Sequence, residues 1–410
     1  MMINIYTKIK DIVDKYPETI SVFYANGFDA TKKEELIEEV GEDSMLKTVL
    51  AIKGINAELF IKQIEEMVGE KDLGFQYVEE VHEKLNFVGY TYCPLKITFK
   101  ETFEKVLKGY IEDTGEKDFK YYIPSGCGNV DPYEDLWKAE DIDELPGVIA
   151  SVGFGDFFRQ EFYEKFVEKG YFKAVDNRQI QQEFVDAGFI DPKGWYTVYS
   201  VAPIVMLIDT KKLGNLPIPK EWKDLLNPLY ENNIIVGASH GDFHEDIFLY
   251  IYKELGDEGV IKLSNNIKRG CHASEMAKLA GTNSKEGAAI YVIPWMFAKS
   301  CPRTETTQVV WPLDGAMTAV YYILVKDGAL PKYQPFVDFL TGYEYGQKSA
   351  NNYFPALNIE VDNNLPRGAK FKWLGWDYIR SCSLHERMEH VMNVFKKSYE
   401  RKFQNEEMVI

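Results

Sequence analysis

One run of apolar and β-branched residues dominates the hydrophobic pattern of the chain, from Tyr196 to Ile208. A turn-rich segment with one glycine and two prolines follows at 214–219, and an amphipathic turn at Trp222–Leu226 ends the stretch. A run of this kind, bounded by glycine and proline, predicts a buried strand. We interpret it as a hinge strand that leaves one packed lobe and enters another.

Strands and helices alternate before this run. Strands are predicted at Asn86–Tyr92, Phe119–Ile123 and Gly147–Ser151, and apolar residues with a 3.6-residue period predict a helix over 99–111 between the first two. This order predicts a parallel, doubly wound lobe. Ligands of such sheets bind beyond the carboxyl ends of the strands.

The alternation resumes after the hinge strand. The predicted elements are a strand at Ile234–Ala238, a helix that ends at Leu255 and begins with the capping pair Asp242 and Glu245, helices at Val260–Ile267 and Ser274–Ala280, a strand at Ala288–Ile293, and two return strands at Val309–Leu313 and Ala316–Val325. Residues 331–404 are predicted to be largely helical, and residues 1–72 form a small helical unit.

Composition narrows the classes of partner. The net charge of −17 is spread without a basic block, which argues against nucleic acid and anionic membranes. No run of 18 apolar residues predicts a bilayer span, and the N-terminus has no apolar signal region, so we expect a cytoplasmic protein unless a leader was removed. The five cysteines are odd in number and lack a CxxC motif, which argues against a disulfide framework or structural zinc site.

The N-terminal unit resembles a small helical domain of unknown function found with hybrid-cluster and redox-associated proteins. The residues that carry the resemblance are DIVDKYPETISVFYANGF (11–28) and MLKTVLAIKGINAELFIKQIEEMV (45–68). That family often has a cysteine just after the glycine of its second helix, where this chain has Phe28-Asp29-Ala30. We therefore expect no redox role, and we expect residues 1–72 to dock a protein partner.

The rest of the chain resembles the type II periplasmic solute-binding proteins of ABC importers, in the branch of ferric-ion, thiamine and phosphonate binders. The segments that carry the resemblance are Tyr199–Pro203, Pro219–Pro228, Trp311–Ala316 and Pro335–Thr341. The resemblance implies an α/β fold with two doubly wound lobes on a two-strand hinge. We place lobe 1 at 85–203, completed by part of 310–410, lobe 2 at 204–310, and C-terminal helices at 331–410.

Adjacent tyrosines bind iron in the ferric-ion branch. Tyr321 and Tyr322 lie here inside the apolar run AVYYILV, where strand alternation directs them to opposite faces. We interpret them as core residues and do not carry the iron-binding role over.

Candidate ligand contacts lie at the predicted strand ends and on the hinge. In lobe 1 they are Tyr92, Cys93, Ser125, Cys127, Gly128, Gly155 and Asp156; on the hinge and in lobe 2 they are Tyr199, Ser200, Trp295 and Asp314. Glycine-rich strand ends let backbone N–H groups approach a ligand, and aromatic walls with few polar groups are typical of small-ligand sites. The alternatives are ordinary tight turns and hinge packing.

The segment HGDFHED (240–246) is the densest group of metal-binding residue types. His240, His244 and Asp246 could hold a transition metal, or the acids could simply cap a helix. Acidic residues here would repel an oxyanion and favour a cation, an amine or a ligand hydroxyl.

These patterns predict a monomeric, non-enzymatic solute-binding protein without a cofactor, which closes two lobes around an ion, amine or small polar molecule. We expect a cytoplasmic sensor or carrier. The alternatives are an enzyme that uses Cys127 or Cys93 with a cleft histidine, and an importer component that lacks its leader.

Overall fold

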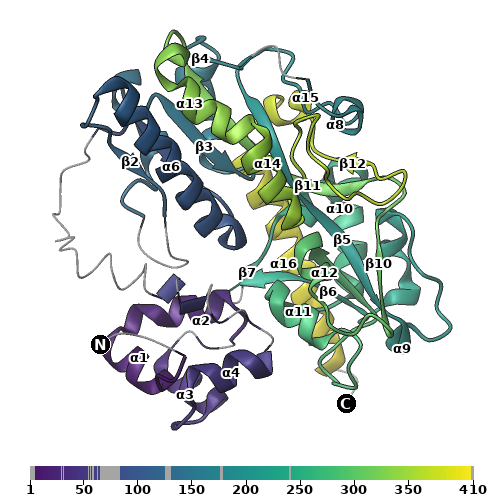
Figure 1. Cartoon of the computed structure of the whole chain (residues 1–410). Helices are drawn as coiled ribbons and strands as arrows, with labels where there is room; N and C mark the ends of the chain where they lie inside the picture. The colour runs from purple at the N-terminus through teal and green to yellow at the C-terminus, as the bar shows by residue number, and fades with distance from the viewer. Residues whose placement is uncertain are drawn as a thin grey trace. The chain divides into compact units, whose positions relative to one another are not determined.

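A computed structural model describes residues 5–28, 30, 32–53, 55, 57, 60, 61, 63, 64, 84–124, 131–175, 179–239 and 242–407. It divides into two compact units (Figure 1). The first comprises Met1–Leu136 and Glu144–Pro146, and the second comprises Trp137–Asp143 and Gly147–Ile410. The boundaries of the two lobes given above remain predictions.

The first unit opens with short helices, as predicted. They are α1 (Ile9–Lys15), η1 (Pro17–Thr19), α2 (Ile20–Ala25), α3 (Lys33–Val40) and α4 (Leu46–Lys53). Their apolar faces form one buried cluster around Phe23, whose ring meets those of Phe28 and Phe60 edge-on at 5.1 and 5.0 Å between centroids. The helical segment therefore has a core of its own.

The same unit contains the first strand–helix–strand pattern. Strand β1 (Phe87–Gly89) leads through η2 (Cys93–Leu95) into α6 (Lys96–Thr114), and β2 (Tyr121–Tyr122) pairs parallel to β1. The helix buries residues at 3.6-residue spacing, which confirms the predicted helix. Both strands are shorter than predicted.

A mixed sheet organises the second unit. Its strand order is β3-β11-β5-β9-β6-β7, with β4 and β12 on β11, β10 on β5 and β8 on β6. The strands are β3 (Val148–Val152), β4 (Phe172–Lys173), β5 (Thr197–Asp209), β6 (Ile234–Ser239), β7 (Asp242–Phe243), β8 (Ile267–Cys271), β9 (Ile290–Pro294), β10 (Thr307–Val310), β11 (Ala316–Lys326) and β12 (Phe371–Lys372).

Strand β5 connects two groups of strands. Its first half pairs antiparallel with β11, which in turn pairs with β3, and its second half pairs with β9 and β10. Every residue of β5 except Ile204 is buried, and every residue of β11 except Lys326. The strand predicted at Tyr196–Ile208 is thus confirmed with a shift of one residue.

Helices connect and cover these strands. They are η3 (Leu136–Lys138), η4 (Ile142–Glu144), η5 (Asp156–Phe158), α7 (Gln160–Phe162), η6 (Tyr163–Val167), α8 (Gln182–Asp186), α9 (Thr210–Leu213), η7 (Trp222–Leu226), η8 (Pro228–Tyr230), α10 (Asp246–Asn266), α11 (Ala273–Leu279), α12 (Trp295–Lys299), α13 (Leu330–Thr341), α14 (Tyr343–Asn351), α15 (Trp376–Arg380) and α16 (Leu384–Glu407). All except η3 and η4, which lie at the boundary of the two units, belong to the second unit.

Three sequence predictions need correction. The predicted helices on either side of Leu255 are one helix, α10, kinked at Gly256, whose φ is +61°. Asp242 does not cap this helix, because it lies in β7 and Glu245 occupies the cap position. The first of the two predicted return strands, Val309–Leu313, is instead β10 at Thr307–Val310, and it pairs with β5 and not with β11.

A buried ion pair fastens α15 to the segment before β5. The fully buried Asp191 carboxylate accepts a hydrogen bond of 2.7 Å from Arg380 and bonds of 3.0 Å from the Trp195 and Tyr196 N–H groups. The guanidinium lies against the rings of Trp195 and Trp376, at 5.0 and 4.9 Å from their centroids. Packing and charge pairing therefore act together here.

We expect Arg380→Met to lower the free energy of unfolding by about 3 to 5 kcal/mol, because it leaves the Asp191 carboxylate buried without its cation. Denaturant titration measures this. The matched control is Lys348→Met, which breaks an exposed pair with Glu344 and should cost under about 1 kcal/mol. Equal losses in the two variants would contradict the structural role of the buried pair.

Candidate functional site

The carboxyl end of β3 presents the first predicted contacts. Gly155 precedes η5, is exposed, and has open space where a Cβ would lie. Asp156 is half-exposed and lies 3.5 Å from Arg159, whose guanidinium stacks 4.2 Å from the Trp137 ring centroid. This strand end therefore offers an accessible carboxylate beside an oriented cation.

Four predicted contacts lie outside the described residues. They are Ser125, Cys127 and Gly128 of lobe 1 and His240 of lobe 2. In the first unit, Tyr92 is partly buried directly before η2. Cys93 is disulfide-bonded, which argues against its use as a free nucleophile and was not predicted from the count and spacing of the cysteines.

The start of α10 carries the histidine and aspartate of the predicted metal segment. The His244 N–H donates to the Gly237 carbonyl at 2.8 Å, and a Cβ on Gly237 would lie 2.6 Å from Nδ1 of the imidazole. Burial lowers the pKa of His244 and raises the pKa of Asp246 to about 6. Among the described residues, no three His, Cys, Asp or Glu side chains are arranged to hold a metal, so a metal here remains a prediction.

An aromatic contact joins this helix to the end of β3. The rings of Phe154 and Tyr250 lie 6.4 Å apart, and the Tyr250 hydroxyl donates to the Thr318 carbonyl of β11 at 2.8 Å. Asp246 lies one turn before Tyr250 and contributes to its raised pKa, although burial is the larger cause. This partly buried carboxylate therefore lies close to the hinge strands.

Both predicted hinge contacts are buried. Ser200 donates to the Pro355 carbonyl at 2.9 Å, and Leu357 N–H donates to the Tyr199 carbonyl, also at 2.9 Å. Among the described residues, the Tyr199 hydroxyl has no hydrogen-bond partner, and burial raises its pKa well above the ordinary value. Such a hydroxyl is costly in the empty fold, which leaves it as a candidate ligand contact.

The two adjacent tyrosines are core residues, as predicted. Tyr321 and Tyr322 are 0% and 1% exposed, and Tyr321 packs against Tyr199 at 5.9 Å between centroids. The pairing of β11 with β5 shifts register between them, so simple alternation does not hold at this point.

The two predicted contacts after the hinge differ in surroundings. Trp295 is buried and meets the rings of Trp311 and Tyr353 edge-on at 5.2 and 5.1 Å. Asp314 lies 2.9 Å from the ammonium of Lys372, which also pairs with Glu254 at 2.6 Å. Trp295 thus belongs to an aromatic cluster, while Asp314 belongs to an ion-pair network.

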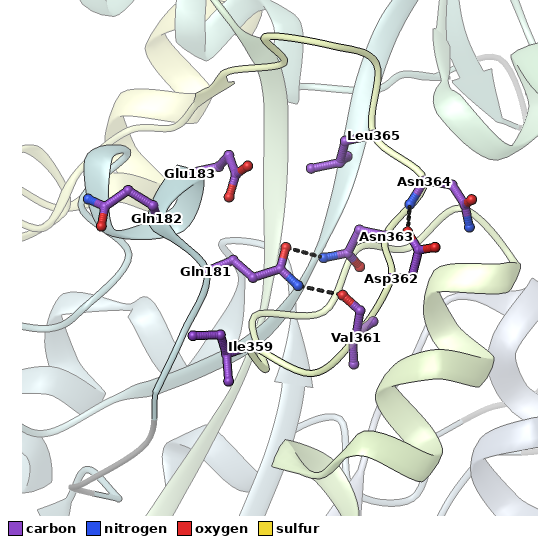
Figure 2. Close-up of a pocket in the computed structure, with 9 residues that line it drawn as sticks. All are labelled: Gln181, Gln182, Glu183, Ile359, Val361, Asp362, Asn363, Asn364 and Leu365. Carbon is purple, nitrogen blue, oxygen red and sulfur yellow. Dashed lines mark hydrogen bonds between the residues drawn. The ribbon is translucent and has the colours of Figure 1, made fainter.

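A pocket of about 440 Å³ lies elsewhere on the second unit (Figure 2). The residues that line it are Gln181, Gln182, Glu183, Ile359, Val361, Asp362, Asn363, Asn364 and Leu365. None of these was predicted from the sequence. Asparagine and glutamine side chains so far apart along the chain give no local signal, because only the fold brings the two segments together.

Comparison with known families identifies the class of the chain. The model of the bacterial extracellular solute-binding proteins matches residues 143–382, which is more than half of the 410 residues, so the chain belongs to this family. A second model, the domain of unknown function DUF1858, matches residues 3–61. No curated protein matches the chain.

Solved structures show the same fold at low identity. Apo ferric ion-binding protein A of Pasteurella haemolytica is 15% identical, with a TM-score of 0.51 over 78% of this chain and 97% of that one. An ABC transporter structure from Clostridium perfringens is 15% identical, with a TM-score of 0.52 over 77% and 100%. The ferric binding protein from Campylobacter jejuni is 12% identical, with a TM-score of 0.50 over 76% and 98%. The predicted fold class is thereby confirmed.

Two tyrosine-to-phenylalanine variants test the unusual hydroxyl on β5. Tyr199→Phe should keep or slightly raise the free energy of unfolding, because it removes a buried hydroxyl that has no described partner. Tyr196→Phe should lower it by about 1 to 3 kcal/mol, because the Tyr196 hydroxyl donates to the buried Phe157 carbonyl at 2.8 Å. Denaturant titration compares the two, and a loss for Tyr199→Phe as large as that for Tyr196→Phe would show that its hydroxyl is paired.

Proposed function

We propose that this protein closes two lobes around a small cation or amine and delivers it to an ABC-type importer. The observation that carries the proposal is the pair of buried strands β5 and β11, which run antiparallel and connect the strand group of β3 with that of β9. Two continuous strands can bend without breaking the pairing within either strand group, and hinge closure around a ligand is a common binding mode.

The charge of the ligand follows from the groups near the hinge. Asp246 is a partly buried carboxylate, and desolvation raises its pKa to about 6, which costs free energy while no cation is bound. A cation placed beside it would stabilise the charged form, whereas an anion would be repelled. Asp156, on the β3 end, adds a second accessible carboxylate. Ferric ion and amines both satisfy this rule.

The proposed cellular location rests on the family description and on the disulfide bond of Cys93. The family description is extracellular, and Cys93 is disulfide-bonded, a modification typical of oxidising compartments. No described helix is long and apolar enough to cross a bilayer. Nothing in the comparisons supports the cytoplasmic sensor or the enzyme considered from the sequence, and the matched family binds solutes.

Fractionation of the native host tests this location. We expect the chain in the extracytoplasmic fraction. We also expect its mobility on a denaturing gel to change when the disulfide bond is reduced. Recovery only with cytosolic markers, with all cysteines alkylatable before reduction, would contradict the proposed location.

The ligand class is tested by thermal unfolding with trivalent and divalent metal ions, primary amines, sugars and oxyanions. A cation or amine at 100 times its dissociation constant should add about 2.7 kcal/mol to the free energy of unfolding. If oxyanions stabilise the protein and no cation does, the proposed ligand class is wrong.

The variant Asp246→Asn tests the effect of this carboxylate on thermal stability and on cation binding separately. Because the pKa of Asp246 is raised in the folded protein, the fold binds this proton more tightly than the unfolded chain does. The resulting stabilisation is complete below about pH 4 and is lost as the pH rises through 6. The variant should therefore melt at a higher temperature than the parent at pH 8 and at a similar one at pH 4.

The same variant should bind the cation at least tenfold more weakly at pH 8. The matched control is Glu258→Gln, which removes an exposed carboxylate from the same helix and should change neither property. Unchanged affinity in Asp246→Asn would exclude this carboxylate from the ligand site.

A further inference from the structure

The pocket of Figure 2 is built from two segments that hydrogen bonds hold together. Gln181, just before α8, donates through Nε2 to the carbonyls of Asn358 and Val361 at 3.1 and 2.5 Å. The Asn363 amide donates to Oε1 of Gln181 at 3.1 Å and to the Ala356 carbonyl at 2.8 Å, as Figure 2 shows in part. Asn363 is 4% exposed. The floor of the pocket is therefore preformed.

The two side-chain amides in this floor, Gln181 and Asn363, have unused hydrogen-bond acceptor positions. A primary amide has two donor hydrogens and an oxygen with two lone pairs. Both hydrogens of Gln181 and both of Asn363 are used by the contacts just given, while each amide oxygen accepts only one bond, from Asn363 and from the Ala356 N–H respectively. Among the described contacts, the amides of the partly buried Gln181 and the buried Asn363 thus retain acceptor capacity and no donor hydrogen.

The rim adds negative charge. Glu183 and Asp362 contribute exposed carboxylates from the two opposite segments, and one Asp362 oxygen accepts from the Asn364 N–H at 3.0 Å. None of the nine lining residues is a lysine, arginine or histidine. Three aliphatic residues complete the lining: Ile359, Val361 and Leu365. The pocket is complementary to a group rich in donors and positive charge that carries a short apolar part.

The pocket is also connected to the hinge. The segment that bonds to Gln181 and Asn363 continues onto the free edge of β5, where Val201 N–H donates to the Pro355 carbonyl at 2.9 Å and Ser200 pairs with Ala356. An occupant that tightens this segment would stiffen the covering of the first half of β5, next to the strand on which lobe closure depends.

We propose that this pocket is a second binding site, specific for a small organic cation such as an alkylammonium or guanidinium group. It shares no residue with the hinge site of the proposed function, and its occupant contacts the segment that supports β5. The volume of about 440 Å³ falls in the range of small-ligand sites.

The test uses n-butylamine, which is protonated at pH 7.5, and 1-butanol as its neutral analogue of equal length. Each of the two compounds is titrated into the full chain, and binding is followed by NMR resonances of the protein or by the heat of binding. We expect saturable binding of the amine that weakens with added salt, and at least fivefold weaker binding of the alcohol. Equal affinity for the two would overturn the proposal.

The double variant Glu183→Gln/Asp362→Asn removes the rim charges and should weaken butylamine binding at this site at least tenfold. Its matched control is Glu168→Gln/Glu360→Gln, which removes two exposed carboxylates that do not line the pocket and should leave affinity unchanged. A double variant that binds like its control overturns the proposal.

The pocket variant and Asp246→Asn together distinguish failure of the pocket proposal from failure of the proposed hinge site. If the pocket variant loses amine binding while Asp246→Asn keeps it, the second site stands without the first. If Asp246→Asn alone loses binding, the hinge site stands and the pocket proposal fails. Loss of one of two binding events in each variant supports both.

Discussion

The structure depends on the antiparallel pairing of β5 with β11. These are the longest described strands, and both are buried along almost their whole length. One pair of strands thus carries the core of two strand groups and also forms the connection between them. Burial of so many aliphatic and aromatic side chains on both faces stabilises the sheet.

This dual role explains which parts of the fold could be predicted from the sequence. A strand buried on both faces has to be apolar without interruption, so Tyr196–Ile208 was identifiable within one residue. Elements that depend on a distant partner were not. The return strand at Thr307–Val310 pairs with β5, and α10 continues past Gly256 with buried apolar residues on both sides of the kink.

The same distinction applies to the candidate sites. Residues at the carboxyl ends of strands, such as Asp156 and Trp295, follow from topology, and the structure does place them there. What the pattern could not show is the environment of each side chain. Asp314 is paired with Lys372 through a contact 58 residues away, and the amides of Gln181 and Asn363 meet across 182 residues. Such pairings are properties of the folded chain alone.

The buried polar groups divide into two kinds, and this division bears on function. Asp191 and Ser200 are fully provided with donors or acceptors, so they stabilise the empty protein. Tyr199 and Asp246 are held at a cost, one as a hydroxyl without a described partner and the other as a carboxyl whose pKa burial raises to about 6. Tyr199 lies on β5, and Asp246 lies one turn before Tyr250, whose hydroxyl bonds to β11. Under the proposed function, a ligand that supplied the missing donor or charge would stabilise these groups, so ligand binding and lobe closure would be favoured together.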